Sequence, residues 1–195
     1  MATVRLGNPL NLPPGLRAWY ENTVHLDLNI FKVLMMSPGT LRPMLELGAH
    51  LMFDIQLPIR LREVAILSAT HAAGAPYAWS HHSDIAENIG FTPEQIAELA
   101  SIDGDLSGFK HDERITIEFA RLAVSASEVS ECTIERARST LGDRQMVELL
   151  NLIGFYWTLS RISTILRVET EPAQGAALIE ATRRIHKEAR DSLRG

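Results

Sequence analysis

Three side chains with acid or base chemistry lie close together in the segment 57–90. Glu63 stands inside an almost wholly apolar run, and Tyr77 and His82 follow shortly after a Gly-Ala-Pro break. The two runs on either side of that break read as two helices packed together. A carboxylate, an imidazole and a phenol on packed helices are the groups from which a proton-transfer site is built.

Glu63 also has a purely structural interpretation. A carboxylate in the first turn of a helix gains from the helix dipole, and either Arg60 or Arg62 could pair with it. The residues that follow are nearly all apolar, which favours a side chain directed into the interior, where an ionised carboxylate needs partners. From position alone, both interpretations stay open.

Helical spacing separates the two adjacent histidines. His82 shares a face with apolar residues, whereas His81 shares one with Tyr77, Asp84 and Asn88. We therefore predict that His82 points inward and that His81 lies at the surface. An inward histidine is also a common core residue, so this position too has a structural alternative.

A metal site is an alternative use of the same residues. His71 follows Glu63 by eight positions, about 80° round a helix, and would line the same pocket. Glu63, His71 and His82 have the composition of a two-histidine, one-carboxylate ligand set. No HExxH motif and no cysteine pair is present. The primary prediction is a site with no metal and no cofactor, and the metal-dependent enzyme is kept as the alternative.

The long apolar segment 143–168 carries further polar side chains. Glu148 and Arg161 fall on one sector and Tyr156 on another. The first sector either faces solvent or a neighbouring subunit, or it lets Arg161 hold a substrate carboxylate, for which a guanidinium is well suited. Cys132 has acidic neighbours that disfavour its thiolate, so a nucleophilic cysteine is not expected.

The pattern of apolar residues predicts an all-α fold of eight or nine helices in one domain, 1–195, preceded by an N-terminal arm over 1–13. A weak internal match of 57–67 to 141–151 suggests two similar helical halves. The expected helices cover 16–35, 40–52, 61–73, 77–89, 93–100, 111–127, 130–141, 143–168 and 173–193.

Composition narrows the class of protein. The net charge of −5 and the absence of a basic block argue against nucleic acid as a partner. No stretch is long and apolar enough for a membrane span, and the N-terminus lacks an apolar signal core. A single cysteine rules out an internal disulfide framework. A cytoplasmic protein is the expectation.

The segment 57–99 resembles the carboxymuconolactone decarboxylase family, which includes the AhpD-type alkylhydroperoxidases. Peroxidase-type members carry a Glu, a CxxC pair that begins twelve residues later, and a His four residues after the second Cys. Here the Glu is Glu63, the cysteine positions hold Ala75 and Ala78, and the His is His82. The resemblance covers roughly 41–168. Without two thiols the chain cannot pass through a disulfide, so thiol peroxidase activity is not expected and the chain resembles a cysteine-free branch.

The resemblance implies an AhpD-like helical bundle and a homotrimer or homohexamer. It also implies a cofactor-independent lyase, decarboxylase or isomerase that acts on a small carboxylate or lactone by general acid/base catalysis. Glu63 and His82 would move protons, Tyr77 would donate to an oxyanion and Trp79 would form an apolar wall. His71, Tyr156 and Arg161 are outer substrate-binding candidates. The remaining alternative is a non-catalytic oligomeric binding protein in which Glu63 and His82 form a structural pair.

Overall fold

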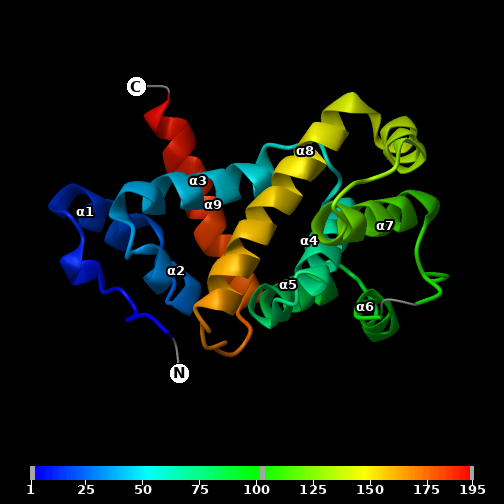
Figure 1. The fold of residues 1–195 in the computed structure, drawn as a ribbon. Coiled ribbons are helices and arrows are strands. Elements are labelled where there is room, and N and C mark those ends of the chain that lie inside the picture. The colour runs from blue at the N-terminus through cyan, green and yellow to red at the C-terminus, as the bar shows by residue number, and fades with distance from the viewer. Residues whose placement is uncertain (1–2, 102–103, 194–195) are drawn as a thin grey trace. The chain divides into compact units, whose positions relative to one another are not determined.

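Helices are the only regular secondary structure in the part of the chain that the structure describes. The structure is a computed structural model and describes residues 3–101 and 104–193. No strand occurs among those residues, which confirms the predicted all-α fold. The elements, labelled in Figure 1, are η1 (Pro9–Asn11), α1 (Pro14–Thr23), α2 (Asn29–Leu34), α3 (Pro38–Phe53), α4 (Ile59–Ala72), α5 (Pro76–Asn88), α6 (Pro93–Leu99), α7 (His111–Ser125), α8 (Glu131–Ile165) and α9 (Gly175–Ser192).

Within residues 3–101 and 104–193, no helix combines the length and apolar character that a bilayer span requires.

The helices form two compact units. The first comprises the chain up to Ile55 and from Ile165 onward, and the second comprises Gln56–Thr164. In the first unit α3 packs against α9, and α1 contacts η1 and α9; in the second, α4 packs against α5, α6 and α7 (Figure 1). The single domain over 1–195 stays a prediction, and both segments of the weak internal match lie in the second unit.

The first unit departs from the sequence prediction between α1 and α2. The single helix predicted over 16–35 is wrong, because the chain leaves the helix after Thr23 and His25 adopts a left-handed backbone with φ of 45°. The guanidinium of Arg184, on α9, donates to the carbonyls of Thr23 at 3.1 Å and Val24 at 2.8 Å. The last carbonyls of a helix have no hydrogen-bond donor within the helix. Here the donor is the guanidinium of Arg184, 160 positions further along the chain.

The N-terminal arm lies along the first unit through backbone contacts. The Gly7 N–H donates to the carbonyl of Lys32 at 2.9 Å, and the Thr3 N–H donates to that of Leu166 at 2.8 Å. A Cβ atom at position 7 would lie 2.6 Å from that Lys32 oxygen. Only glycine therefore permits this approach without a shift of the chain.

The second unit is built around α4. Every residue from Leu61 to Thr70 is buried, as the continuous apolar run predicted. One side of the helix belongs to a core cluster of Val64, Leu67, Ala86, Phe91, Leu99, Leu106, Phe109 and Ile117. A helix buried on most of its surface carries any polar side chain on it into the interior. The position of Glu63 follows from this.

Two local signals in this unit were read correctly from the sequence. Thr92 accepts from the Gln95 N–H at the start of α6, and the Gln95 side chain accepts from the Thr92 N–H in return, which is a capping box. Within α8, Gly142 has φ of 77° and separates two helical segments at the predicted boundary. The long segment after Gly142 carries Tyr156 towards the site.

Candidate active site

The centre of the candidate site is the carboxylate of Glu63, which is fully buried in α4. One oxygen, Oε2, accepts a hydrogen bond from His82 Nδ1 of α5 at 2.8 Å. The other, Oε1, accepts from Arg62 Nε at 3.2 Å. Glu63 is 0% exposed and His82 is 3% exposed. The two helices predicted to face each other therefore bring acid and imidazole into direct contact.

Arg62 is the charge partner of the buried carboxylate. Its side chain is itself buried, and a buried carboxylate is tolerable when a cation and hydrogen bonds compensate it. The sequence left Arg60 and Arg62 as equal candidates. In the structure Arg60 pairs with Glu113 on α7, with Arg60 Nε 2.7 Å from Glu113 Oε1. The Arg60 guanidinium also stacks over the Phe91 ring.

Tyr156 closes the site from α8. Its ring meets the His82 ring edge to face, with centroids 4.7 Å apart and planes at 87°. Burial raises the pKa of the Tyr156 phenol, and the nearby Glu63 carboxylate raises it further. The phenol therefore keeps its proton across the neutral range and is able to donate it in a hydrogen bond.

The entry to α4 is held by a second buried carboxylate, Glu148 of α8. Its Oε2 accepts from the backbone N–H groups of Gln56 at 2.8 Å and Leu57 at 3.0 Å. Its Oε1 accepts from Arg144 at 2.9 Å. Glu148 therefore fixes where α4 begins, within two turns of Glu63.

The prediction that His81 lies at the surface is wrong. His81 is 2% exposed, about as little as His82. Its ring packs against that of Tyr77, one turn earlier on α5, with centroids 5.2 Å apart. Tyr77 is buried as well. The face predicted to be polar is thus covered at Tyr77 and His81, whereas Asp84 is half-buried and Asn88 is exposed.

The other predicted site residues take separate places. Trp79 packs against the core cluster that contains Val64, and its ring lies 5.5 Å from that of His71. Burial and the charge of Arg121 lower the pKa of His71. Arg161 is exposed on α8. The structure thus joins Glu63, His82 and Tyr156. The role of Tyr77 as an oxyanion donor and the substrate-binding roles of Trp79, His71, Tyr156 and Arg161 stay predictions.

The alternative ligand set of Glu63, His71 and His82 is not assembled. Over the described residues, these three do not form a cluster whose potential ligand atoms all lie within 4.8 Å of one another. His71 is instead engaged with Trp79. The geometry does not support a metal ion at this pair.

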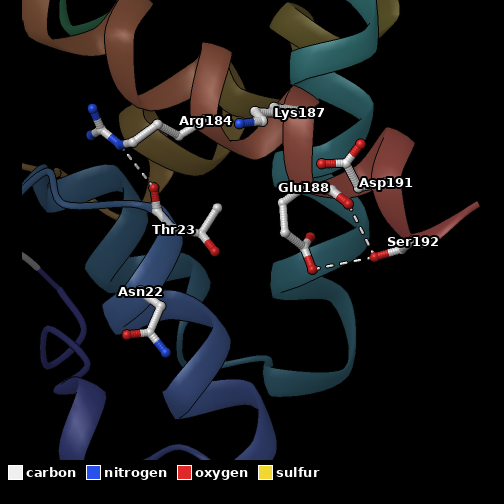
Figure 2. A pocket seen from close by; sticks show the side chains of 7 residues that line it. All are labelled: Asn22, Thr23, Arg184, Lys187, Glu188, Asp191 and Ser192. Atoms are coloured by element: carbon white, nitrogen blue, oxygen red, sulfur yellow. Dashed lines mark hydrogen bonds between the residues drawn. The ribbon is translucent and has the colours of Figure 1, made fainter. Parts of the chain in front are cut away.

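A pocket of about 560 Å³ lies in the first unit, between the end of α1 and α9 (Figure 2). Its lining mixes cations and anions, and several of these groups serve internal contacts: Arg184 caps α1, while Glu188 accepts from Trp19 Nε1 at 2.8 Å and from Ser192. Figure 2 shows Arg184 directed at Thr23 and Ser192 at Glu188.

The fold is that of AhpD-like helical proteins. A peroxidase-related protein from Silicibacter sp. superposes with a TM-score of 0.72 at 18% identity, over 87% of this chain and 92% of that one. An alkylhydroperoxidase AhpD core protein from Ralstonia eutropha superposes with a TM-score of 0.72 at 18% identity, over 93% of this chain and 96% of that one. A cysteine-to-alanine variant of the debrominase Bmp8 in complex with 2,3,4-tribromopyrrole superposes with a TM-score of 0.69 at 17% identity, over 96% of this chain and 95% of that one.

Residues 38–112 match the model of the carboxymuconolactone decarboxylase family. The resemblance read from the sequence is thereby confirmed over this region, and the fold around it is AhpD-like. No curated protein matches the chain. The matched region contains Glu63 and His82, whereas Tyr156 lies beyond it. Its cysteine positions are filled by Ala75 and Ala78, and Cys132 is free and exposed.

Proposed function

We propose that this chain is a cofactor-independent lyase or isomerase that moves protons on a small carboxylate or lactone through His82 and Glu63. The observation that carries the proposal is the 2.8 Å hydrogen bond between His82 Nδ1 and a fully buried Glu63 carboxylate. With Glu63 accepting from Nδ1–H, the lone pair of the ring lies on Nε2, so Nε2 is the atom that takes or gives a proton.

The neighbours of this pair suit such a step. The Glu63 carboxylate stabilises the imidazolium that forms when Nε2 takes up a proton, and Arg62 pairs with Glu63 in the interior. Tyr156, held in its phenol form, is a donor for an enolate or carboxylate oxygen. In an isomerisation His82 would remove a proton from one carbon and return it to another. In a decarboxylation the electrons left by departing CO₂ enter the conjugated carbonyl, and His82 protonates carbon.

A proton-exchange screen tests this function without knowledge of the substrate. Unsaturated lactone carboxylates, β-keto acids and their saturated analogues are incubated with the protein in D₂O, and deuterium uptake and CO₂ release are followed by NMR. We expect the wild-type chain to accelerate one of these classes and His82→Asn to lose at least about 100-fold of that rate, as general acid/base catalysis requires. Wild-type rates equal to buffer for every class, or equal rates for both proteins, would refute the proposal.

The second candidate is a binding protein whose Glu63–His82 pair only supports the fold. The burial of both side chains within a single chain favours it. The two functions separate in the same screen, because a structural pair predicts that His82→Asn lowers stability while no exchange is catalysed by either protein.

We also propose that the chain forms a homotrimer or homohexamer through α8. Val147, Leu150 and Trp157 lie on one side of this helix and are 59%, 47% and 46% exposed. An exposed apolar stripe of this kind marks an interaction surface. A second copy of the chain is the partner that the family resemblance suggests.

Placing a charge on that stripe should break the assembly. We expect light scattering after gel filtration to give three or six times 21.7 kDa for the wild-type chain and a single-chain mass for Trp157→Lys. Leu122→Lys, at a 38% exposed apolar residue of α7, is the matched control and should keep the wild-type mass. A wild-type monomer, or an unchanged mass for Trp157→Lys, would count against this interface.

A further inference from the structure

Three potential metal ligands converge where α3 meets α9 in the first unit. His50 is in the last turn of α3, and Asp54 follows that helix as its C-terminal cap. Residues four apart on a helix lie on the same face, so both side chains project to one side. His186, on α9, approaches the same point.

The potential ligand atoms of these residues are close enough to share one ion. His50 Nδ1 lies 2.5 Å from Asp54 Oδ2, and His186 Nε2 lies 2.8 Å from Asp54 Oδ1. All the candidate atoms lie within 4.8 Å of one another. Ligands bound at roughly 2.0–2.2 Å from a central ion are themselves at most about twice that distance apart. Small side-chain rotations would thus place an ion between them.

The surroundings distinguish this cluster from an ordinary surface ion pair. His186 Nε2 is buried and makes no aligned hydrogen bond in the part of the chain that the structure describes, although the carboxylate is adjacent. The His186 ring is packed against Phe53, with centroids 5.4 Å apart. The nearby cation Arg183 stacks over the Phe53 ring and pairs with Glu180, so its charge is compensated by groups outside the cluster.

We propose that His50, Asp54 and His186 bind one divalent transition-metal ion, with Zn²⁺ the best match. Two imidazoles and one carboxylate suit Zn²⁺, Ni²⁺ or Fe²⁺, whereas Mg²⁺ and Ca²⁺ take oxygen ligands almost exclusively. The His50 and Asp54 side chains are 33% and 38% exposed, so the ion has an open side where water completes its coordination. The site lies in the first unit and is separate from Glu63 and His82.

Binding would join α3 to α9 through the metal. Because the three ligands come from segments more than 130 positions apart in the chain, the unfolded chain lacks the preformed site. An ion that binds the folded form alone raises thermal stability with the logarithm of its concentration once that concentration exceeds the dissociation constant. Zinc should therefore raise the melting temperature of the wild-type protein and not that of a ligand variant.

The test uses the full chain without a histidine tag, stripped with a chelator and dialysed against ZnCl₂. Elemental analysis should find one zinc per chain in the wild type and in His111→Ala, which removes an exposed histidine from α7. We expect His186→Gln and Asp54→Asn to weaken binding at least tenfold. Co²⁺ added in place of zinc should give visible absorption bands in the wild type and in His111→Ala, and not in the two ligand variants.

Several outcomes would overturn the proposal. One is zinc below stoichiometric amounts in the wild type; another is equal affinity in the wild type and both ligand variants. In a third outcome both variants melt at a lower temperature than the wild type, but zinc does not change the melting temperature of the wild type. The three residues would then form a hydrogen-bonded contact and no metal site. Circular dichroism checks that His186→Gln folds. Should it fail to fold, His50→Ala, at a partly exposed ligand, supplies the same comparison.

Discussion

Replacing Glu63 with Gln is expected to reduce proton transfer by about 10²–10⁴-fold, the usual contribution of a positioned acid or base. The amide has the size of the carboxylate and can still contact His82 Nδ1, so the helices keep their positions. It lacks the negative charge that stabilises the imidazolium, and its NH₂ group can favour the wrong tautomer of the ring. The loss should therefore fall mainly on kcat, with little change in KM.

Glu113 offers a matched control for this variant. It is also buried, and it also pairs with an arginine, Arg60, at 2.7 Å. Glu113→Gln should thus lower stability in a similar manner and leave proton transfer near the wild-type rate. The measurement is the kcat of both variants on a substrate from the exchange screen, with circular dichroism and oligomer size as checks. Full activity in Glu63→Gln would remove Glu63 from the mechanism.

Replacing Arg62 with Met should destabilise the fold by about 3–5 kcal/mol, because it leaves a buried carboxylate without its cation. The side chains of Arg62 and Glu63 are 8% and 0% exposed, so water cannot take over the role of the guanidinium. Urea unfolding, followed by circular dichroism, measures the loss. The exposed pair Arg138–Glu135 is the control, since its side chains are 52% and 62% exposed. Arg138→Met should cost less than about 1 kcal/mol.

A second substitution separates lost charge from lost packing. Adding Glu63→Gln to Arg62→Met removes the uncompensated carboxylate, so the double variant should recover part of the stability lost by the single one. Packing alone predicts no recovery, because Gln and Glu fill the same space. A double variant no more stable than Arg62→Met would show that the guanidinium acts through its volume.

Sequence reasoning found the features that depend on neighbouring residues. The capping box at Thr92, the break at Gly142 and the buried run around Glu63 were all read correctly, because each is set by local chemistry or by helical spacing. The contact between Glu63 and His82 followed from two helices joined by a short break. The predictions that failed concern features that depend on contacts with residues distant in the sequence.

Two particular failures show the reason. The break after Thr23 depends on Arg184, whose guanidinium reaches the end of α1 from α9. The burial of His81 depends on covering structure that its own helix does not reveal. The sequence does not decide between Arg60 and Arg62 as the partner of Glu63 for the same reason. Arg60 pairs with Glu113, more than 50 positions later, and Arg62 pairs with Glu63. Tyr156 is predicted from the sequence as an outer substrate-binding residue, but nothing in the sequence places its ring against that of His82.

The spacing of these residues along the chain has a consequence for the order in which the protein folds. Glu63 and His82 are 19 positions apart, on consecutive helices, whereas Tyr156 follows His82 by 74 positions. Contacts between near residues close short loops and carry the smaller entropy cost. The α4–α5 hairpin can therefore bring its charges together while water still surrounds them, before α8 brings the Tyr156 ring to that of His82. A polypeptide that assembles in this order never has to bury the carboxylate alone.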